Sequence, residues 1–481
     1  MSTAQQLGLI GNSVKVQSLP TASAETFGAG NRFYTLIGQQ EGYITGHTYR
    51  TVVANNVYSW EDIDGSEETT YDYTVKVIDY DGTVLLEKKG NTGDVINLPM
   101  APTHEKLVFQ EWSASVAVSD NKVTIVDNDI MVGAVYTTVS GQNEFDITLT
   151  KVTGLSVTLN MDGTKDWGDG TSDTATTHTY TAYGDYTIKC NGTTMTTSSS
   201  SGLFGQSSNS TNYYCTKARF STVTSMSIYA FYNCLSLTNV IISNSVKSVG
   251  SCEFYNCYSL INIVIPNGVT SMGDSTFYRC YSLTNVVIPN GVTSIDSNEF
   301  NTCYSLTNIV IPNSVKNIYS KAFQYCYSLT SVIIPNGVTS IPFGIFENCY
   351  SLTRVIIPNS VTFIEDSSFR NCYSLTNIVI PNSVKNMYGS AFYFCYSLTN
   401  IVMPKSVKSI GNYVFYNCYS LTKYDFSQCS SVPTLSNTSC FTSINPICKI
   451  IVPDRLYNTW KAASNWSAYA DYIYKASEVT Q

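Results

Sequence analysis

Nine cysteines recur at a constant spacing of 23 residues, and this repeat constrains the fold more than any other feature of the sequence. We write plus n for the residue n positions after the cysteine of its copy. A phenylalanine stands at minus three, a leucine at plus three, and apolar residues stand at plus six, eight, twelve and fifteen. The pattern predicts two short strands joined by a turn in each copy. The repeating cysteines are Cys234, Cys257, Cys280, Cys303, Cys326, Cys349, Cys372, Cys395 and Cys418.

One such copy has too little apolar surface to fold alone, so the copies are expected to stack into a solenoid with a continuous core. Each large side chain that becomes fully buried contributes about 1.5 to 3 kcal/mol. The cysteine column lies between phenylalanine and leucine columns, which favours buried free thiols and folding in a reducing compartment. Cys252, Cys429, Cys440 and Cys448 fall outside the column, and the sequence leaves their pairing open.

The unit L-x-x-[IV]-x-I-P-x-x-V-x-x-I-x-x-x-x-F-x-x-C resembles the BspA-like leucine-rich repeats of bacterial surface and secreted proteins. The resemblance covers residues 213–448 and implies a leucine-rich-repeat solenoid used for adhesion and recognition. Residues 449–481 are similar to the usual end of such arrays and are expected to cap the core. That cap is predicted to use a strand from Ile450 to Val452 and the side chains of Trp460, Trp466, Tyr469 and Tyr472.

The first 65 residues carry a different pattern. Leu19-Pro20-Thr21-Ala22-Ser23 precedes an aromatic strand, and matching segments follow at 34–38, 46–49 and 60–63. This module resembles one found near the start of tail-fibre, head-fibre and other appendage proteins of tailed bacteriophages. The resemblance implies attachment to a virion and folding in the host cytoplasm. The start of the chain also shows neither the apolar core nor the basic start of a secretory signal.

Two β segments and a polar stretch are expected before the array. Residues 66–140 contain Asp81-Gly82, a strong hairpin signal, and are similar to β-grasp repeats of bacterial surface proteins. Residues 141–192, with Asp166 to Thr171 and His178-Thr179-Tyr180, resemble a PKD-type, Ig-like sandwich. Residues 193–212 are rich in Ser, Thr and Asn and predict a linker or long loop. The predicted fold class is therefore mainly β and multi-domain, with small N-terminal β modules followed by a solenoid of 23-residue repeats.

Several function classes are disfavoured by composition. Residues 1–212 hold 11 Lys and Arg against 24 Asp and Glu, and residues 213–448 hold 12 against 8, which argues against nucleic-acid binding. The three histidines, His47, His104 and His178, lie in different predicted modules, so no histidine-based catalytic site is expected. Asp162, Asp166 and Asp169 lack calcium-loop spacing. No apolar run reaches the ~20 residues of a membrane span. We expect no catalytic residue, no metal and no cofactor.

Residues at plus one and plus seven are predicted to point outward. They either stack as ladders that stiffen the solenoid or form an exposed apolar stripe for a partner. The ladder is the favoured interpretation for the tyrosines at plus one and the asparagines at plus five, and both interpretations stay open for plus seven. The candidate binding stripe comprises Ile241, Val264, Val287, Val310, Ile333, Ile356, Val379 and Val402 together with Tyr258, Tyr281, Tyr304, Tyr327, Tyr350, Tyr373, Tyr396 and Tyr419.

Together these patterns predict a non-catalytic structural protein of a phage virion, in a head or tail fibre or decoration, whose array adheres to the host surface. Its expected partners are other virion proteins, through residues 1–65, and a host cell-surface glycan or protein, through the array. No nucleic-acid partner and no membrane insertion are expected, and a homo-oligomer stays open. The alternative is a bacterial cell-surface adhesin, and a glycan hydrolase ranks third.

Overall fold

The computed structural model describes most of the chain after residue 72 and four strands before it. The chain divides into two units, Met1–Asp72 and Tyr73–Gln481. No helix in the part described is long and apolar enough to cross a membrane. The described residues are 13–16, 33–36, 48–54, 57–62, 73–126, 128–198, 201–206 and 210–479.

The first unit contains one sheet in the order β1-β2-β3-β4. Strands β1 and β2 are parallel, and the other neighbours are antiparallel. The predicted aromatic strand at Phe33 and Tyr34 begins β2, Tyr49 lies in β3, and Trp60 lies in β4, whereas His47 and residues 19–23 lie outside the described residues. The bounds are β1 (Ser13–Val16), β2 (Phe33–Leu36), β3 (Thr48–Ala54) and β4 (Val57–Asp62).

The second unit begins with a β domain at residues 73–138. It has a mixed sheet in the order β6-β5-β11-β8, in which β11 runs parallel to β5, and a small sheet β7-β10-β9. The turn at Asp81-Gly82 joins β5 to β6, and Gly82 adopts a φ of +89°, so the predicted hairpin is confirmed. The bounds are β5 (Tyr73–Ile78), β6 (Val84–Gly90), β7 (Val95–Asn97), β8 (Leu107–Ala114), β9 (Val118–Ser119), β10 (Lys122–Thr124) and β11 (Ile130–Thr138).

Residues 141–192 do not form a separate domain, which corrects the predicted boundary at residue 192. Strand β12 pairs with β17 on one side and with β18 of the repeat array on the other, so one eight-stranded sheet runs through both. One hydrophobic core extends from Phe145 into the array. This segment therefore closes the N-terminal end of the solenoid. The bounds are β12 (Asn143–Leu149), β13 (Ser156–Thr158), β14 (Lys165–Asp166), β15 (Ser172–Asp173), β16 (Thr177–Thr179), β17 (Gly184–Cys190) and β18 (Cys215–Arg219).

The described residues of the polar stretch, 193–198, 201–206 and 210–212, are packed against the first turn, so the prediction of a linker is wrong for them. Its few apolar side chains, Met195, Leu203 and Phe204, are buried in the array's core. The Leu203 amide donates to the carbonyl of Ala230, and the Leu203 carbonyl accepts from Asn160. The average composition did not predict this packing. Three apolar residues are enough to anchor the segment, because the neighbouring elements supply the rest of the core.

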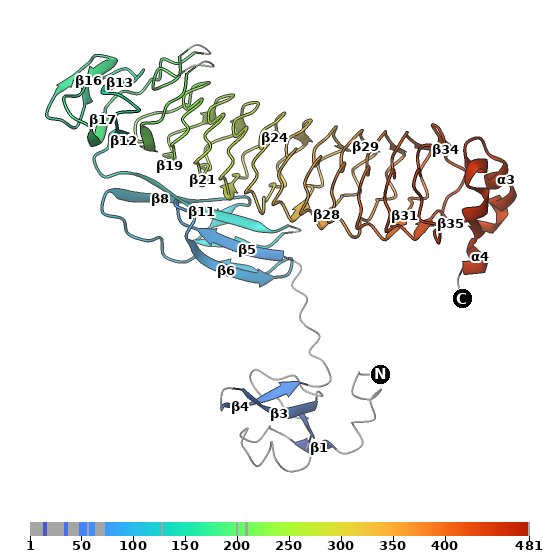
Figure 1. The fold of residues 1–481 in the computed structure, drawn as a ribbon. Helices are drawn as coiled ribbons and strands as arrows, with labels where there is room; N and C mark the ends of the chain where they lie inside the picture. Colours follow the sequence, from blue (N-terminus) through green and yellow to red (C-terminus); the bar gives the residue numbers. More distant parts are fainter. Residues whose placement is uncertain are drawn as a thin grey trace. The chain divides into compact units, whose positions relative to one another are not determined.

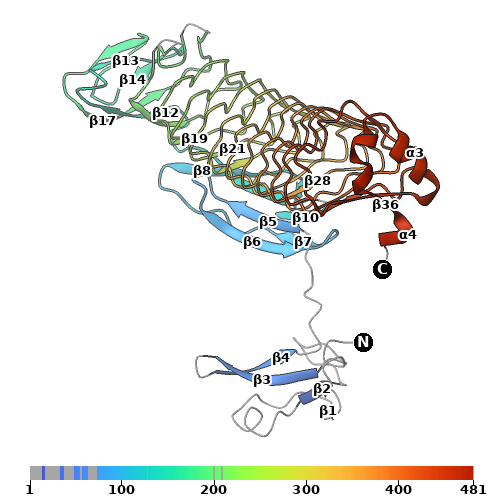
Figure 2. The same cartoon turned by 45° about the vertical axis from the view of Figure 1, so that its right-hand side comes forward.

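The repeats stack into a solenoid with two rows of short parallel strands, one row on each side of the core (Figures 1 and 2). Paired residues are 23 positions apart, as in Asn239, Asn262 and Asn285. The first row lies at plus five to plus seven, and we call its outer side the front face. Its strands are β19 (Asn239–Ile241), β21 (Asn262–Val264), β23 (Asn285–Val287), β26 (Ser331–Ile333), β28 (Arg354–Ile356), β31 (Asn400–Val402) and β33 (Lys423–Asp425).

The second row consists of two-residue strands at plus fourteen and plus fifteen, except for the last strand, β34, which lies two residues later in its copy. We call the outer side of this row the back face. Two residues per turn with positive φ, such as Asn256 and Ser275, let the chain reverse between the rows. The strands are β20 (Ser248–Val249), β22 (Ser271–Met272), β24 (Ser294–Ile295), β25 (Asn317–Ile318), β27 (Ser340–Ile341), β29 (Phe363–Ile364), β30 (Asn386–Met387), β32 (Ser409–Ile410) and β34 (Thr434–Leu435).

All predicted core columns are buried. The phenylalanine rings stack from copy to copy, with centroids 5.4 Å apart between Phe231 and Phe254. Each thiol from Cys257 to Cys418 donates to the carbonyl of a phenylalanine 26 residues earlier, at 3.1 Å for Cys257 and 3.2 Å for Cys326. All fifteen cysteines are free thiols, and burial raises the pKa of the Cys418 thiol to about 12. The thiols therefore act as small core groups that also satisfy a backbone carbonyl.

The C-terminal segment covers the open end of the core, as predicted. Trp460 and Trp466 are fully buried, and both rings lie 5.3 Å from the ring of Phe426. The Trp466 indole donates to the carbonyl of Pro433 at 2.7 Å. A final strand that the sequence did not predict extends the sheet beyond β35. The bounds are β35 (Lys449–Val452), η2 (Asp454–Leu456), α3 (Tyr457–Ala462), η3 (Trp466–Tyr472), β36 (Ile473–Lys475) and α4 (Ala476–Val479).

Candidate functional site

The β domain covers the N-terminal half of the front face. The plus-seven side chains of the first four copies are at most 7 % exposed. Three of them pack against Ile78 of β5 and against Met131 and Val135 of β11. The prediction that this row is exposed is therefore wrong for its first four members, because a domain more than 100 residues earlier in the chain folds back over them. These members are Ile241, Val264, Val287 and Val310.

Polar contacts fix the register between the β domain and the array. Asn267 donates to the carbonyl of Trp112 at 2.8 Å, and Asn128 donates to the carbonyl of Ile311 at 2.8 Å. The Asn290 amide donates to the carbonyl of Ala114 at 3.0 Å. These bonds go to backbone groups beside the apolar contact, so they hold one alignment of the two sheets.

Gly133 allows a close approach of the two sheets at this interface. It lies on the same side of β11 as Met131 and Val135, and a Cβ atom there would stand 2.6 Å from a Val264 methyl and 2.9 Å from a Val287 methyl. No side chain fits in that space. Side chains of β11 alternate between two apolar clusters. Ile130, Val132 and their even-numbered neighbours enter the core of the β domain, whereas Met131 and Val135 face the array.

The C-terminal half of the front face is not covered by any described residue. Ile333 and Ile356 are half-buried, Val379 is 74 % exposed, and Val402 is 57 % exposed. A hollow of about 540 Å³ lies on this part of the face. It is lined by Thr353, Arg354, Val355, Ile356, Ile357, Thr376, Asn377, Ile378 and Val379. This uncovered half is the candidate binding surface.

The plus-one tyrosines form the predicted ladder. Neighbouring rings from Tyr258 to Tyr419 stack with centroids 4.4 to 5.7 Å apart. Burial in the ladder raises the pKa of Tyr327 to about 12. At plus five, Asn285 donates to Asn262 at 2.9 Å, and Asn262 donates to the Asp81 carbonyl at 2.6 Å. Stacking therefore accounts for the tyrosines, and the asparagines contribute both to a ladder and to the domain interface.

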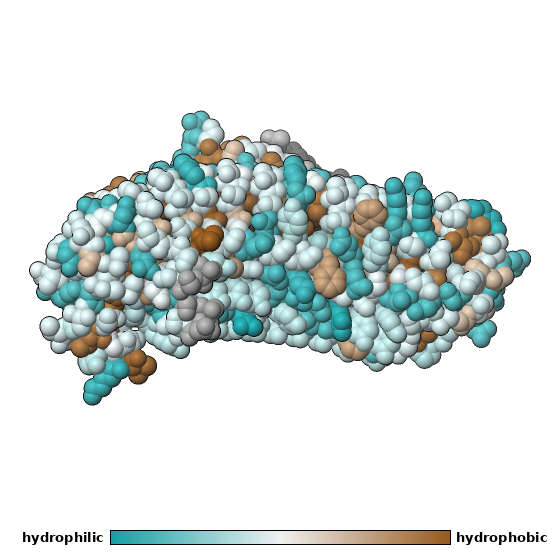
Figure 3. Space-filling model, turned by 90° about the horizontal axis from the view of Figure 1, so that it is seen from above, coloured by the Kyte–Doolittle hydropathy of each residue, from teal (hydrophilic) through white to brown (hydrophobic). Residues whose placement is uncertain are grey.

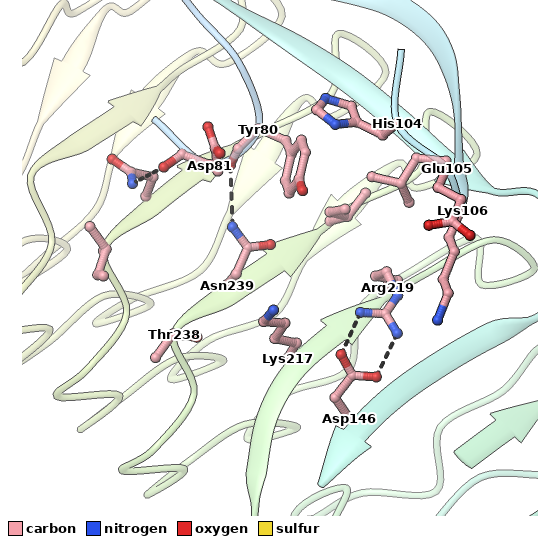
Figure 4. Close-up of a pocket in the computed structure, with 14 residues that line it drawn as sticks. Tyr80, Asp81, His104, Glu105, Lys106, Asp146, Lys217, Arg219, Thr238 and Asn239 are labelled. Carbon is pink, nitrogen blue, oxygen red and sulfur yellow. Dashed lines mark hydrogen bonds and ion pairs between the residues drawn. The ribbon is translucent and has the colours of Figure 1, made fainter. Parts of the chain in front are cut away.

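A second hollow of about 540 Å³ lies where the β domain meets the start of the array (Figure 4). Arg219 of β18 holds Asp146 of β12 through two bonds of 2.8 and 2.6 Å, and it also bonds Glu144 at 3.1 Å. Although burial opposes ionisation of Asp146, Arg219 lowers its pKa below the usual value. His104 pairs with Asp79 at 2.8 Å. The Arg219 charge is thus compensated by two carboxylates, which suits a structural junction.

The three aspartates considered as calcium ligands, Asp162, Asp166 and Asp169, bond to groups of the protein itself. Asp162 accepts from the amides of Thr193 and Thr194 at 2.7 and 2.8 Å, and Asp166 accepts from the amide of Gly168 at 3.0 Å. Asp169 pairs with His178 at 2.8 Å. Within the described ranges, no group of three or more His, Cys, Asp or Glu residues could hold a metal ion.

Comparison with known proteins identifies the repeats. A family model described as "BspA type leucine rich repeat region" matches residues 224–353 and 339–463, in six copies. No curated protein matches the chain. A leucine-rich repeat protein from Bacteroides ovatus is 24 % identical and covers 48 % of this chain and 76 % of its own, with a TM-score of 0.27. A leucine rich cell surface protein from Faecalibacterium prausnitzii is 26 % identical, and the match covers 55 % of this chain and 91 % of that protein, with a TM-score of 0.30.

Proposed function

We propose that this chain, whose residues 224–463 belong to the BspA type of leucine-rich repeat, is a non-catalytic recognition protein that binds a partner protein through the uncovered half of its front face. The observation that carries the proposal is the division of one repeated surface into two halves. One half already binds a β-sheet domain, and the other half presents the same row of aliphatic side chains to solvent.

The covered half indicates the chemistry of the partner. There, a sheet with aliphatic side chains at alternate positions packs on the plus-seven row, and donors beside it reach backbone carbonyls. The uncovered row continues the same surface with Ile333, Ile356, Val379 and Val402. A partner that presents a similar aliphatic sheet face would extend the existing interface by the same packing. An exposed apolar row of this kind is typical of interaction surfaces.

Charging this row tests the proposal. In the triple variant Ile356→Lys, Val379→Lys and Val402→Lys, binding of labelled protein to intact candidate host cells should fall at least about tenfold, because three ammonium groups would lose their hydration in an apolar contact. The solenoid should stay folded, since these side chains do not enter the core. Flow cytometry measures the binding, and thermal unfolding checks the fold.

Ile447→Lys is the matched control, because Ile447 is also 74 % exposed but lies outside the front-face row. It should bind cells as the unchanged protein does. If the triple variant remains folded and binds cells normally, the proposed binding surface is wrong.

In this proposal the chain belongs to a phage virion, with residues 1–65 as the attachment module and the array directed to the host surface. The resemblance of residues 19–63 to phage appendage modules supports this location, and so do fifteen free thiols, which suit folding in a reducing cytoplasm. Mass spectrometry of purified virions and of bacterial surface fractions decides the location. Recovery with the bacterial surface fraction alone would instead support the cell-surface adhesin.

A further inference from the structure

The back face carries a group of exposed aromatic side chains that the front-face proposal does not use. Phe343, Phe363 and Tyr388 are 38 %, 38 % and 48 % exposed, and they line one hollow of about 390 Å³. The hollow is completed by Glu365, Asp366 and Gly389. Figure 3 shows the side of the array seen from above, where hydrophobic patches interrupt a mostly polar surface.

The repeats themselves show that the solenoid does not require these aromatic residues. Phe363 pairs in register with Ser340 and with Asn386, and Ser409 follows in the same row, so this position is otherwise small and polar. Tyr388 occupies the plus-sixteen position, where three other copies have glycine. The core columns, in contrast, barely vary. The aromatic residues therefore stand at outward positions whose side chain the fold does not determine.

The lining combines two features that attract a cation. The faces of aromatic rings carry negative potential, and two carboxylates stand beside them. The Phe363 and Tyr388 rings are tilted by 50° with centroids 6.5 Å apart, and in the described part of the chain no cation lies over either ring. Glu365 is held in place because one of its oxygens accepts from the Phe343 amide at 3.1 Å.

The neighbouring side chains define the charge of the hollow. Glu365 and Asp366 are the charged residues of its lining, so a bound anion would face two carboxylates. Outside the lining, the Lys321 ammonium lies over the Phe343 ring, 5.4 Å from its centre. One ring of the aromatic group therefore already contacts a cation of the protein. A compact, strongly hydrated cation gains little from apolar rings, whereas a methylated ammonium group buries its methyl groups against them.

We propose that this hollow binds a quaternary ammonium group, with the Phe363 and Tyr388 rings against its methyl groups and the Glu365 and Asp366 carboxylates beside its charge. The site is independent of the front-face partner. A free trimethylated amine and the choline head group of a lipid present the same chemistry to it.

Calorimetric titration of the full chain with choline chloride and with 3,3-dimethyl-1-butanol tests the proposal, because the alcohol has the same shape without the charge. Choline should bind at least about tenfold more tightly than the alcohol. Equal affinities, or binding of a neutral monosaccharide in preference to choline, would overturn it. Phosphatidylcholine vesicles form a second arm: co-sedimentation with them indicates a lipid source, and its absence alongside choline binding indicates a soluble one.

The repeats supply variants that the fold tolerates. Phe363→Ser and Tyr388→Gly introduce residues that other copies have at these positions. Each should weaken choline binding about two- to fivefold without shifting the thermal midpoint. Tyr319→Gly is the matched control, because Tyr319 also stands at plus sixteen and is 48 % exposed but does not line the hollow. Unchanged choline binding in both site variants would contradict the assignment.

Discussion

Replacing Gly133 with leucine is expected to release the β domain from the array while both parts remain folded. The new side chain has no room, since even its Cβ would stand 2.6 Å from Val264. The leucine would hold the two sheets apart, so the six apolar side chains that now bury one another would lose their contacts across the interface. The β domain keeps most of its own core, because that core lies on the other side of β11 and includes one side chain of the array, Ile241.

Hydrogen exchange measures this release directly. The Asn290 amide donates to Ala114 across the interface, whereas the Val292 amide donates to Pro289 within the array. In the Gly133→Leu protein, Asn290 should lose its protection and Val292 should keep it. Val108→Leu, at a position 49 % exposed in the same domain, should change neither amide. Retained protection at Asn290 would show that the domain is held by contacts other than the sheet face.

The stability of the array should fall as the pH rises, because two carboxyl groups are buried in its core. Glu253 and Glu299 are fully buried, and within the described residues no cation is paired with either carboxyl. Burial raises the pKa of both carboxyls well above the usual 4.5. Below pH 4.5 both carboxyls are protonated in the folded and in the unfolded chain, so they do not change the free energy of unfolding. Above pH 4.5 the unfolded chain ionises first, so each carboxyl costs about 1.4 kcal/mol per pH unit until the pH passes its folded-state pKa.

Denaturant unfolding between pH 4.5 and 7 checks this dependence. The double variant Glu253→Gln and Glu299→Gln should be much less sensitive to pH over that range, because its side chains do not ionise. Glu347→Gln serves as the control, since the Glu347 carboxylate already accepts from Gln324 at 2.6 Å. An equal pH dependence in the double variant and the unchanged protein would show that other groups are responsible.

The repeat made most of the fold predictable. Every core column follows from apolar residues at fixed positions, and the terminal cap follows from Trp460 and Trp466 beyond the last copy. The pairing of β12 with β18 was not predictable, because sheet partners far apart in sequence leave no periodic signal. The packing of Leu203 and Phe204 was missed because average composition hides a few buried residues.

The candidate surfaces were harder to predict for a related reason. Val264 and Val379 occupy equivalent positions in nearly identical copies, yet the first is 5 % exposed and the second is 74 % exposed. The difference arises from Met131 and Val135, which no property of the repeat reveals. The aromatic hollow is visible in the sequence, because Phe363 stands in one copy where the neighbouring copies have a small polar residue.

The docking of the β domain on one end of the array also determines how such a chain can change in length. Inserting one more 23-residue copy after Cys372 would move the cap outward by one strand spacing, about 4.8 Å, and leave every contact of Gly133 and Asn290 unaltered. Each added copy would lengthen only the uncovered row. Duplication can therefore adjust the reach and the number of contact positions in uniform steps, while the anchored end stays the same.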